Sequence, residues 1–526
     1  MLRGFNTIFW LTHCFMWSQK LLLNPLAIVE LSSPSVYGKS RYSRISLTVL
    51  PGISRKKFRF HEILKTARER STNAEQDERF VEMRWFNIEP NSTIALYGHP
   101  PEYNITNMLE RVSSTDQSSG YYITNITMPR LQCDTPFVLN NNCIYFWIAV
   151  LDTKMRIMEV DCFRGFPFWM YEAREFLSNV EIRRAFIPGT HNSGTYDYYD
   201  GGTVHARVTQ YVECQDESVF NQLFYGARYI ELRASFSPKR RQARPANIVC
   251  IDQENDNANG SNNVLNDMYR EERGLDCRTA TFWSVHGSFV TTSSFDQIAR
   301  DIRRFLEATK EIVLIDLHKF KISGKWWWTT DLHLELWRLL SSELGEFMAP
   351  FKEDVTFGEL WESNKRLIVS TAHPVPDVSP CIWPSFLHIW ANTDRLSQLE
   401  LFLDARLCAE VQNSKRITVA KGQLTPRLGL KMLRNTLRNR GGVRSFTPGT
   451  NRVMDRLYRN KLACANVVAV DYLLSSDVVR VAIAVNTTPE SPTNNARFPP
   501  NVSFNRSIHN VDESLFRPMC KRRVRL

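Results

Sequence analysis

Residues 168–486 alternate short apolar runs with longer amphipathic stretches, a pattern typical of βα units around a parallel sheet. Two of the longer stretches, 294–306 and 332–340, carry apolar residues at helical spacing, which predicts helices with one buried face. The runs that we predict to be strands are 185–188, 228–233, 282–286, 312–318, 366–371, 386–390, 416–420 and 467–471. A set of eight parallel strands can close into a barrel. The sequence therefore predicts an α/β fold, a (β/α)8 TIM-like barrel over residues 168–486.

The preceding region, residues 45–165, has a shorter rhythm. Its runs alternate apolar and polar positions, are rich in β-branched and aromatic residues, and are separated by Asn, Pro and Gly. Examples are 57–61, 81–86, 92–97 and 143–150. This pattern predicts a small all-β, sandwich-like domain in front of the barrel. No set of chemically reactive residues converges in it, so we interpret it as an accessory domain.

The two ends of the chain differ from both regions. Residues 1–44 contain an apolar run, 8–17, with the length of a signal-peptide core, followed by a Ser-rich spacer, so we predict a targeting segment. Residues 487–526 are rich in Pro, Asn and Ser and end in basic residues, which indicates a largely unstructured basic tail. Residues 237–277 are polar and Asn-rich and predict a surface loop. We predict no transmembrane segment.

Cysteines and potential glycosylation sites favour an oxidising compartment. The chain has 11 cysteines without a Cys-x-x-Cys pair, so disulfides are favoured over metal sites, with Cys133–Cys143 and Cys250–Cys277 as candidate pairs. Asn-x-Ser/Thr acceptors begin at Asn91, Asn104, Asn125, Asn259, Asn486, Asn501 and Asn505. We therefore expect a secreted protein or one in the lumen of the secretory pathway.

The net charge of +11 favours an anionic partner, which can be nucleic acid, a membrane surface or an acidic substrate. The chain shows no zinc-finger spacing, no phosphate-binding glycine loop and no basic-aromatic RNA motif, so we predict no nucleic-acid partner. We therefore expect the partner to be an anionic lipid, a phospholipid or GPI-type substrate at a membrane surface. The sequence does not indicate the oligomeric state.

Polar residues stand at the carboxyl end of nearly every predicted strand. They are His191, Asn192, Glu231, Arg233, His286, Asp316, His318, Asn392, Lys421, Gln423 and Asp471. Residues two apart on a strand share a face, which in a closed barrel can be the lumen. Charges at these positions are difficult to explain as core, because a buried charge without a partner costs several kcal/mol. Two histidines with an arginine suit phosphodiester cleavage: one imidazole accepts a proton, the other donates one, and the guanidinium binds the phosphoryl oxygens.

Five segments, in this order, resemble the X domain of phosphatidylinositol-specific phospholipase C. They are Ile-Pro-Gly-Thr-His-Asn-Ser-Gly (187–194), Gly-Ala-Arg-Tyr-Ile-Glu-Leu-Arg (226–233), Trp-Ser-Val-His-Gly (283–287), Glu-Ile-Val-Leu-Ile-Asp-Leu-His (311–318) and Thr-Phe-Gly-Glu-Leu-Trp (356–361). The chain looks most similar to X-domain proteins that lack pleckstrin, EF-hand and C2 modules, and to the bacterial enzymes. The resemblance implies a TIM barrel with phosphoric diester hydrolase activity.

The resemblance also implies residue roles. His191 matches the general base that deprotonates the inositol 2-hydroxyl, and His286 matches the general acid that protonates the diacylglycerol oxygen. Arg233 matches the arginine that replaces calcium in bacterial enzymes. Asn192 and Glu231 match calcium ligands of animal enzymes, but Arg233 places a positive charge where the ion would bind. We therefore expect no cofactor and no calcium requirement.

Some positions depart from the family pattern. Asn192 stands where bacterial enzymes have an aspartate, and His318 where other members have Glu or Lys. Asp471 is our candidate to orient His191, with Asp316 as the alternative. We predict Asn192 and Glu231, together with Asp316, His318 and Lys421, to bind substrate.

Three functions remain open from the sequence. The first is a metal-independent hydrolase of an inositol phospholipid or of a GPI anchor on another protein. The second is a catalytically inactive protein that binds lipid headgroups or glycans on the same barrel. The third is a metal-dependent barrel phosphodiesterase acting on glycerophosphodiesters or sphingomyelin, against which Arg233 argues.

Overall fold

The computed structural model of the chain describes residues 44–52, 78–114, 117–131, 142–196, 210–236, 282–287, 289–322, 328, 330–371, 373, 379–426, 442–460 and 465–487. All of them belong to one unit of the chain, Tyr42–Leu526. The predicted targeting segment, the strand at 57–61, the loop at 237–277 with its Cys250–Cys277 pair, and the tail beyond residue 487 lie outside the described residues. Among the described helices, none combines the length and the apolar character needed to cross a membrane.

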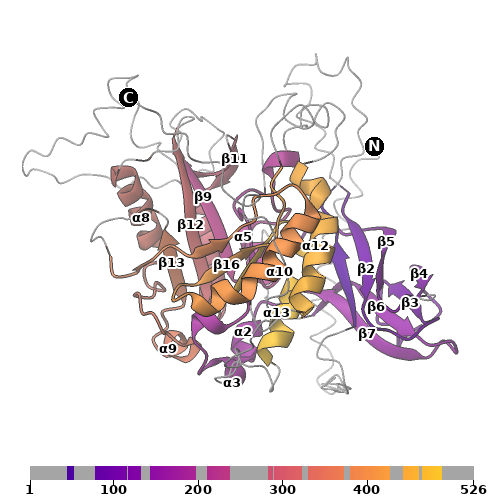
Figure 1. Cartoon of the computed structure of the whole chain (residues 1–526). Helices are drawn as coiled ribbons and strands as arrows, with labels where there is room; N and C mark the ends of the chain where they lie inside the picture. The colour runs from indigo at the N-terminus through magenta and orange to yellow at the C-terminus, as the bar shows by residue number, and fades with distance from the viewer. Residues whose placement is uncertain are drawn as a thin grey trace, which may run out of the picture. The chain divides into compact units, whose positions relative to one another are not determined.

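A curled sheet of ten strands occupies the centre of the α/β region (Figure 1). Its hydrogen-bonded path is β14 (Ile382–Trp383), β13 (Leu367–Thr371), β12 (Val313–Ile322), β9 (Tyr229–Phe236), β8 (Ile187–Thr190), β17 (Val467–Val470), β16 (Thr418–Lys421) and β15 (Leu387–Ile389). Neighbours on this path are parallel, so their carboxyl ends gather at one rim. No ladder joins β14 to β15 among the described residues, so closure into a full barrel stays a prediction.

The run 282–286 forms a strand, β10 (Phe282–His286), but not a parallel one. It runs antiparallel to the carboxyl half of β9 and pairs as a hairpin with β11 (Phe289–Ser294). Gly287 in the connecting turn has a φ of 58°, a conformation that favours glycine. Apolar spacing does not reveal strand direction, so our prediction of a third parallel barrel strand here is wrong. The path contains the two-residue β14 instead, which is too short to leave a pattern.

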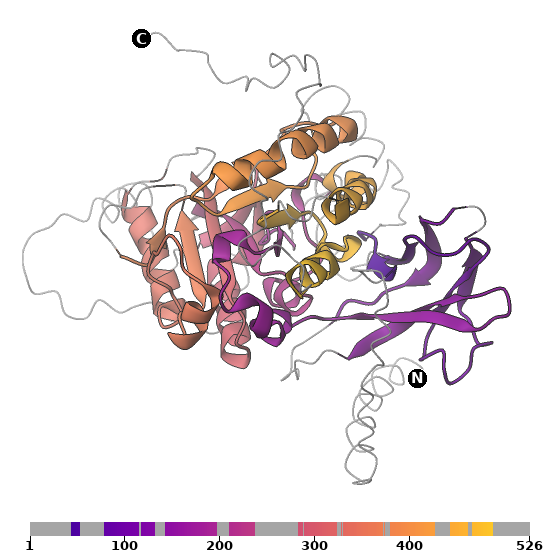
Figure 2. The ribbon, with the colours of Figure 1, turned by 60° about the horizontal axis from the view of Figure 1, so that its bottom comes forward.

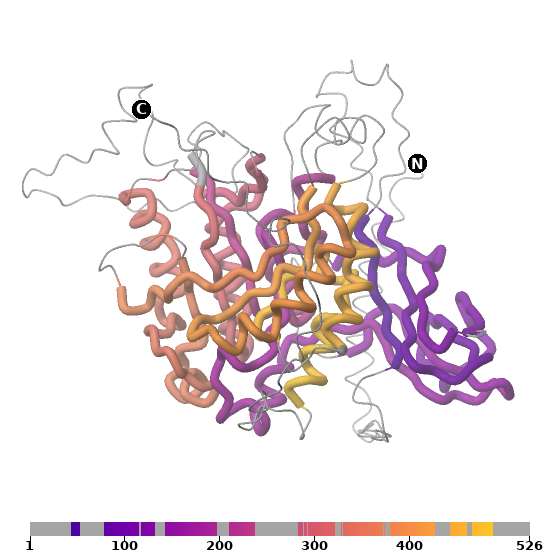
Figure 3. Tube along the Cα trace, viewed as in Figure 1, coloured from indigo at the N-terminus to yellow at the C-terminus, as the bar shows by residue number. Residues whose placement is uncertain are grey.

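Helices lie on the outer side of the curled sheet. Along the chain, inner strands alternate with these outer helices (Figures 2 and 3). The predicted helical stretches are confirmed as α7 (Phe295–Ala308) and α8 (Thr330–Leu344). Ser294 caps α7 by accepting a hydrogen bond from the Gln297 N–H. The remaining α-helices within the described residues are α2 (Trp169–Glu172), α3 (Arg174–Leu177), α5 (Val219–Phe224), α9 (Phe357–Glu362), α10 (Leu396–Asn413), α12 (Gly442–Asn460) and α13 (Val478–Thr487).

The region before residue 165 forms two antiparallel sheets. One consists of β1 (Ile45–Val49), β2 (Phe80–Trp85) and β5 (Gly120–Thr127), and the other of β4 (Glu110–Ser113), β3 (Thr93–Tyr97), β6 (Cys143–Leu151) and β7 (Ile157–Arg164). Their apolar side chains share one buried cluster with α10, α12 and α13. The two regions therefore have a common core, and the predicted division into a β-rich domain and a barrel domain stays a prediction.

The disulfide in this region differs from the candidate pair. Cys143 on β6 is bonded to Cys162 on β7, with 5.6 Å between their Cα atoms. The strands are antiparallel neighbours, which brings the two cysteines within bonding distance. The expected Cys133–Cys143 pair is therefore wrong, because Cys143 is already bonded. Spacing along the chain could not reveal this partner across the sheet.

The described glycosylation acceptors differ in exposure. Asn91, Asn104 and Asn125 are exposed. Asn486 is 0% exposed, and its side-chain amide exchanges hydrogen bonds with the backbone N–H and carbonyl of Phe186 at 3.1 and 2.7 Å. Asn486 is therefore not accessible to a glycan in the folded chain. The others, Asn259, Asn501 and Asn505, lie outside the described residues.

Candidate active site

His191 and Asp471 lie side by side because their strands are neighbours. β8 and β17 pair in parallel, and each residue follows directly after the end of its strand. The His191 backbone N–H donates to the Val470 carbonyl at 2.9 Å, and its ring Nδ1 lies 2.7 Å from Asp471 Oδ1. Both side chains are buried. The structure thus brings Asp471 to His191, whereas the alternative, Asp316, bonds elsewhere.

Arg233 determines which nitrogen of His191 carries the proton. Its Nη2 lies 2.6 Å from His191 Nε2. A guanidinium only donates hydrogen bonds, so Nε2 must be the unprotonated nitrogen, and Nδ1–H then donates to Asp471. Burial lowers the pKa of His191 well below its usual value, and the charge of Arg233 adds to this effect. The neutral imidazole therefore presents the lone pair that a general base needs.

Glu231 balances two cations at the centre of the site. Its Oε1 accepts hydrogen bonds from Arg233 Nε and Nη2 at 2.9 and 2.8 Å, and its Oε2 accepts from Lys421 Nζ. Burial alone would raise the pKa of Glu231, but the charges of Lys421 and Arg233 outweigh burial and hold this pKa well below its usual value. The guanidinium plane is consequently held in one orientation, beside the imidazole of His191.

His286 reaches the same place from the β10–β11 hairpin. Its ring is perpendicular to that of His191, with 6.0 Å between the centroids. His286 Nδ1 donates to the Val212 carbonyl at 2.9 Å, so in the neutral ring the lone pair is on Nε2. Burial and the charge of Arg233 lower the pKa of His286 to about 4. The site therefore holds two neutral imidazoles beside the guanidinium of Arg233 at neutral pH.

Cys214 is a neighbour of this group that the sequence did not indicate. Its buried thiol lies 3.6 Å from His286 Nδ1. Burial and the charge of Asp471 raise the pKa of the thiol well above its usual value, so it stays protonated. Asn192, in the left-handed region with a φ of 45°, places its Nδ2 4.0 Å from the same sulfur. Asn192 Oδ1 is buried and has no hydrogen-bond partner among the described residues.

A second polar group surrounds Asp316. Its Oδ2 accepts hydrogen bonds from the Tyr229 hydroxyl at 2.6 Å and from His388 Nε2 at 2.7 Å. The His318 ring lies 4.1 Å from that of His388. Burial alone would raise the pKa of Asp316, but the hydrogen bond and the charge of His388 outweigh burial and hold this pKa below its usual value. Burial lowers the pKa of His318 to about 3, so this ring is also neutral.

Lysines link the two groups and make the site electropositive. Lys421 Nζ lies 3.5 Å from the Tyr229 hydroxyl while it also bonds to Glu231. Lys319 Nζ lies 5.5 Å from the centre of the Trp390 ring. Burial and the charge of Arg233 lower the pKa of Lys319 to about 8, which leaves it mostly charged at neutral pH. An anionic ligand would be attracted by this arrangement.

Two sets of side chains bring metal-ligand atoms within 4.8 Å of one another: His191, Cys214 and Asp471, and Asp316, His318 and His388. In the first set, the guanidinium of Arg233 faces His191 Nε2 and the thiol stays protonated. In the second set, Asp316 Oδ2 already has two donors, and the Lys421 cation is close by. Neither environment favours a divalent cation, although independence from metal stays a prediction.

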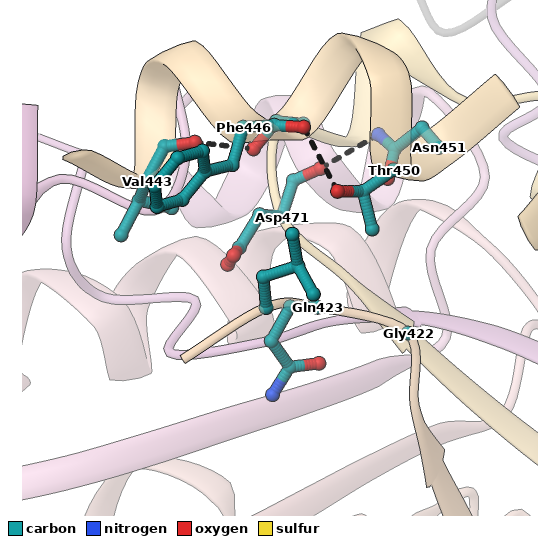
Figure 4. A pocket seen from close by; sticks show the side chains of 9 residues that line it. Gly422, Gln423, Val443, Phe446, Thr450, Asn451 and Asp471 are labelled. Carbon is teal, nitrogen blue, oxygen red and sulfur yellow. Dashed lines mark hydrogen bonds between the residues drawn. The ribbon is translucent and has the colours of Figure 1, made fainter. Parts of the chain in front are cut away.

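A shallow recess lies beside Asp471, between α12 and the chain that follows β16 (Figure 4). It is lined by Gly422, Gln423, Leu424, Val443, Phe446, Thr447, Thr450, Asn451 and Asp471. Asn451 Nδ2 donates to the Asp471 carbonyl at 3.0 Å, which fixes the backbone of this residue from the α12 side. The carboxylate points away from that contact (Figure 4).

Sequence reasoning missed several members of the site. Cys214, Lys319 and His388 belong to no motif that we identified, and Tyr229 lies in the segment 226–233 but was not named as a site residue. Tyr229 and His388 lie within predicted strands, 228–233 and 386–390, and Lys319 directly follows the predicted strand 312–318. Alternation along β9 places Tyr229 on the face of Glu231 and Arg233, and this was the signal available for Tyr229. The roles assigned to the named residues stay predictions.

No protein-family model matches the chain. A relative named PI-PLC X domain-containing protein 3 from Mus musculus is 23% identical over 358 residues, which cover 61% of this chain and 94% of the relative. The Homo sapiens protein of the same name is 22% identical over 355 residues, which cover 60% and 92%.

Solved structures of bacterial enzymes also align with the chain. The phosphatidylinositol-specific phospholipase C from Listeria monocytogenes aligns with a TM-score of 0.42 at 12% identity, over 61% of this chain and 98% of that one. A variant of the Staphylococcus aureus enzyme gives 0.41 at 12% identity, over 60% and 97%. The resemblance expected from the five segments is confirmed, and the chain is a distant relative of the PI-PLC X domain-containing proteins.

Proposed function

We propose that the chain is a phosphoric diester hydrolase of the phospholipase C type, which cleaves an inositol phospholipid or a GPI-type anchor without a metal ion. The observation that carries this proposal is the meeting of His191, Arg233 and His286, with Asp471 behind the first imidazole. Similarity to PI-PLC X domain-containing proteins supports the substrate class.

The reaction would begin with the substrate's own hydroxyl group attacking phosphorus. The proton of that hydroxyl passes to His191 Nε2, and the bond between phosphorus and the lipid oxygen breaks. For this transfer, the Arg233 N–H must turn from Nε2 to a phosphoryl oxygen, which the negative charge of the phosphate favours. The guanidinium then stabilises the charge that develops on the phosphoryl group.

His286 would protonate the departing lipid oxygen through Nε2. Its pKa is about 4, so the ring must gain a proton when the substrate binds. An anion within about 4–6 Å of a titratable group commonly raises its pKa by ~1–3 units. A bound phosphodiester would therefore bring His286 close to the range in which it can act as a general acid. The Val212 carbonyl keeps Nδ1–H occupied and leaves Nε2 for the substrate.

The remaining polar residues would bind the headgroup. Lys421 and His318, together with the Asp316–His388 pair, offer donors and acceptors that suit ring hydroxyls. Asn192 Oδ1, buried without a described partner, would accept a hydrogen bond from the substrate. We also propose that the protein acts at a membrane surface in a secreted or lumenal compartment, which the Cys143–Cys162 disulfide supports.

The test is the release of water-soluble inositol phosphate from phosphatidylinositol vesicles in the presence of EDTA. We expect the wild-type chain to release it and His286→Ala to be inactive. Equal release by both proteins would remove the acid–base mechanism. Restoration of a metal-depleted, inactive protein by added calcium would instead support a metal-dependent enzyme.

A catalytically inactive headgroup-binding protein is the second candidate. The observation that favours it is the low pKa of His286 in a site where Arg233 already occupies His191 Nε2. Such a protein would bind phosphoinositide vesicles and release no product. Vesicle binding that is lost in Arg233→Ala, without turnover in the wild type, would establish this function.

A further inference from the structure

Two loops hold the partners of the catalytic imidazoles. In the loop 212–217, the Val212 carbonyl accepts from His286 Nδ1, and Gln215 Nε2 donates to the His191 and Val470 carbonyls at 3.1 and 2.9 Å. In the loop 471–477, the Asp471 carboxylate faces His191. A shift of either loop would therefore move a histidine or its partner.

The two loops are bonded to each other. Tyr472, in the left-handed region with a φ of 47°, donates its backbone N–H to the Cys214 carbonyl at 2.7 Å. Its hydroxyl donates to the Glu213 carbonyl at 2.9 Å. The Leu473 N–H donates to Gln215 Oε1 at 3.0 Å. A non-glycine residue adopts a positive φ only when its surroundings stabilise that conformation. The backbone of Tyr472 is therefore fixed by its hydrogen bonds to the loop 212–217.

An arginine of the amino-terminal sheet reaches the loop 471–477 from behind. Arg84 lies on β2, which runs next to α12 (Figure 1). Its Nη2 donates to the Ser475 carbonyl at 2.8 Å, and its Nη1 donates to Asp455 Oδ2, on α12, at 2.6 Å. That same oxygen accepts the Asp477 backbone N–H at 3.0 Å. Arg84 and both aspartates are 1% exposed.

A second arginine and a serine repeat this arrangement. Arg79, which precedes β2 and is 1% exposed, forms an ion pair with Glu217 of the other loop. Ser46 on β1 donates its hydroxyl to Asp477 Oδ2 at 2.9 Å. Buried ionic contacts add little net stability compared with apolar packing, but they specify one arrangement because each hydrogen bond fixes an atom. Side chains of the amino-terminal sheet thus contact both loops that hold the imidazole partners.

We propose that the β1–β2–β5 sheet is a positioning element of the active site and that Arg84 is its main positioning residue. By fixing Ser475 and the Asp455–Asp477 contact, Arg84 holds the loop 471–477 so that Asp471 faces His191 Nδ1. Arg79 does the same for the loop 212–217 and His286. The proposal that the sheet positions the imidazoles does not require the protein to be an enzyme. The expected effect of the sheet on the reaction rate, however, rests on the proposed function.

The chain offers a matched control for this proposal. Arg480 on α13 also joins the amino-terminal sheets to the α/β region, through an ion pair with Asp161 and a hydrogen bond to the Cys162 carbonyl at 2.7 Å. These two contacts go to β7, and the link of Arg480 to the loops is the effect of its charge, which together with burial and the charges of Arg459 and Arg84 sets the lowered pKa of Asp477. Arg480→Met therefore weakens the connection between the regions and removes a nearby positive charge, but it removes no hydrogen bond to either loop.

The experiment compares Arg84→Met, Arg84→Lys and Arg480→Met by long-range ¹H–¹⁵N spectra of the histidine rings. In Arg84→Met we expect His191 to lose its single Nδ1–H tautomer, and kcat to fall between ~10- and ~100-fold with KM little changed, as for a small misplacement of a catalytic group. Arg84→Lys keeps a positive charge between the buried aspartates, so it should fold and recover part of the tautomer preference. Arg480→Met should match the wild type in both measurements.

Three results would overturn the proposal: an unchanged His191 spectrum in folded Arg84→Met, an equal change in Arg480→Met, or an Arg84→Lys chain whose His191 is no closer to the wild type than that of Arg84→Met. If Arg84→Met does not fold, the proposal is tested by the His191 spectrum of Arg84→Lys alone. A lysine cannot donate to both Asp455 and the Ser475 carbonyl as the guanidinium does, so a wild-type His191 spectrum in Arg84→Lys would contradict the proposed role of these two contacts. If the wild type shows no turnover, the proposed hydrolase function fails, but the ring spectra still decide whether the sheet positions the imidazoles.

Discussion

Replacing Asp471 with asparagine should separate orientation from binding. The carboxylate accepts the Nδ1–H of His191 at 2.7 Å in a buried site. A hydrogen bond to a charged group contributes ~1.5–3 kcal/mol. Since about 1.36 kcal/mol corresponds to a tenfold change in rate, the loss of this contact alone predicts a decrease of roughly 10- to 150-fold in kcat for Asp471→Asn. If the new amide turns its NH₂ toward Nδ1, the ring adopts the wrong tautomer, and losses of ~10⁴-fold are known for such triads.

The same substitution should change how the stability of the fold depends on pH. Burial and the charge of Glu231 raise the pKa of Asp471 well above its usual value. The unfolded state therefore releases this proton more readily, and stability decreases as the pH rises from the unfolded pKa through the folded one. An amide does not ionise, so Asp471→Asn should lose this dependence, and its unfolding temperature should decrease less than that of the wild type between pH 5 and pH 7.

The assay measures kcat and KM on phosphatidylinositol vesicles, together with thermal unfolding at pH 5 and pH 7. Asp316→Asn is the matched control, because Asp316 is a buried aspartate of the same site that contacts Tyr229 and His388 and not His191. We expect that control to raise KM more than it lowers kcat. The reasoning is refuted if Asp471→Asn keeps kcat within about threefold of the wild type, or if Asp316→Asn lowers kcat as much.

Three further predictions concern pH, arginine geometry and the disulfide. Because burial lowers the pKa of His191 well below its usual value and that of His286 to about 4, kcat/KM should be maximal below pH 6.5; a pH–rate profile with its maximum above pH 8 would contradict this. Arg233→Lys keeps the charge but loses the planar fork that contacts both Glu231 and His191, so kcat should fall by ~10²–10³-fold; activity within a few fold of the wild type would show that charge alone suffices. Cys162→Ser removes a disulfide that spans 19 residues, so chemical denaturation should show a loss of ~3 kcal/mol with kcat unchanged; an unchanged unfolding midpoint would argue that Cys143 and Cys162 are not bonded.

Local patterns were sufficient for most of the strands and for the central residues of the site. His191, Arg233 and Asp471 each follow or end an apolar run, and parallel pairing brings the ends of such runs to one rim. The helical stretches α7 and α8 were predictable because their apolar residues recur at helical spacing. In these places short-range sequence and tertiary structure agree.

Long-range geometry explains what could not be predicted. The direction of β10 depends on the turn at Gly287, and the partner of Cys143 depends on the register between β6 and β7. His388 joins the site because β15 places it opposite Asp316, a pair separated by 72 residues in the chain. The sequence places Arg84 in the predicted accessory domain, because a buried ion pair with a distant aspartate leaves no local pattern.

The central claim is that His191 and His286 share one phosphoryl group. It is tested most directly by titrating ¹⁵N-histidine-labelled protein with myo-inositol 1-phosphate and following both imidazoles by NMR. Both rings should respond with the same apparent Kd, and the pKa of His286 should rise from about 4 toward its usual value as the anion binds. A ligand that shifts only one of the two rings, or neither, would contradict the shared site.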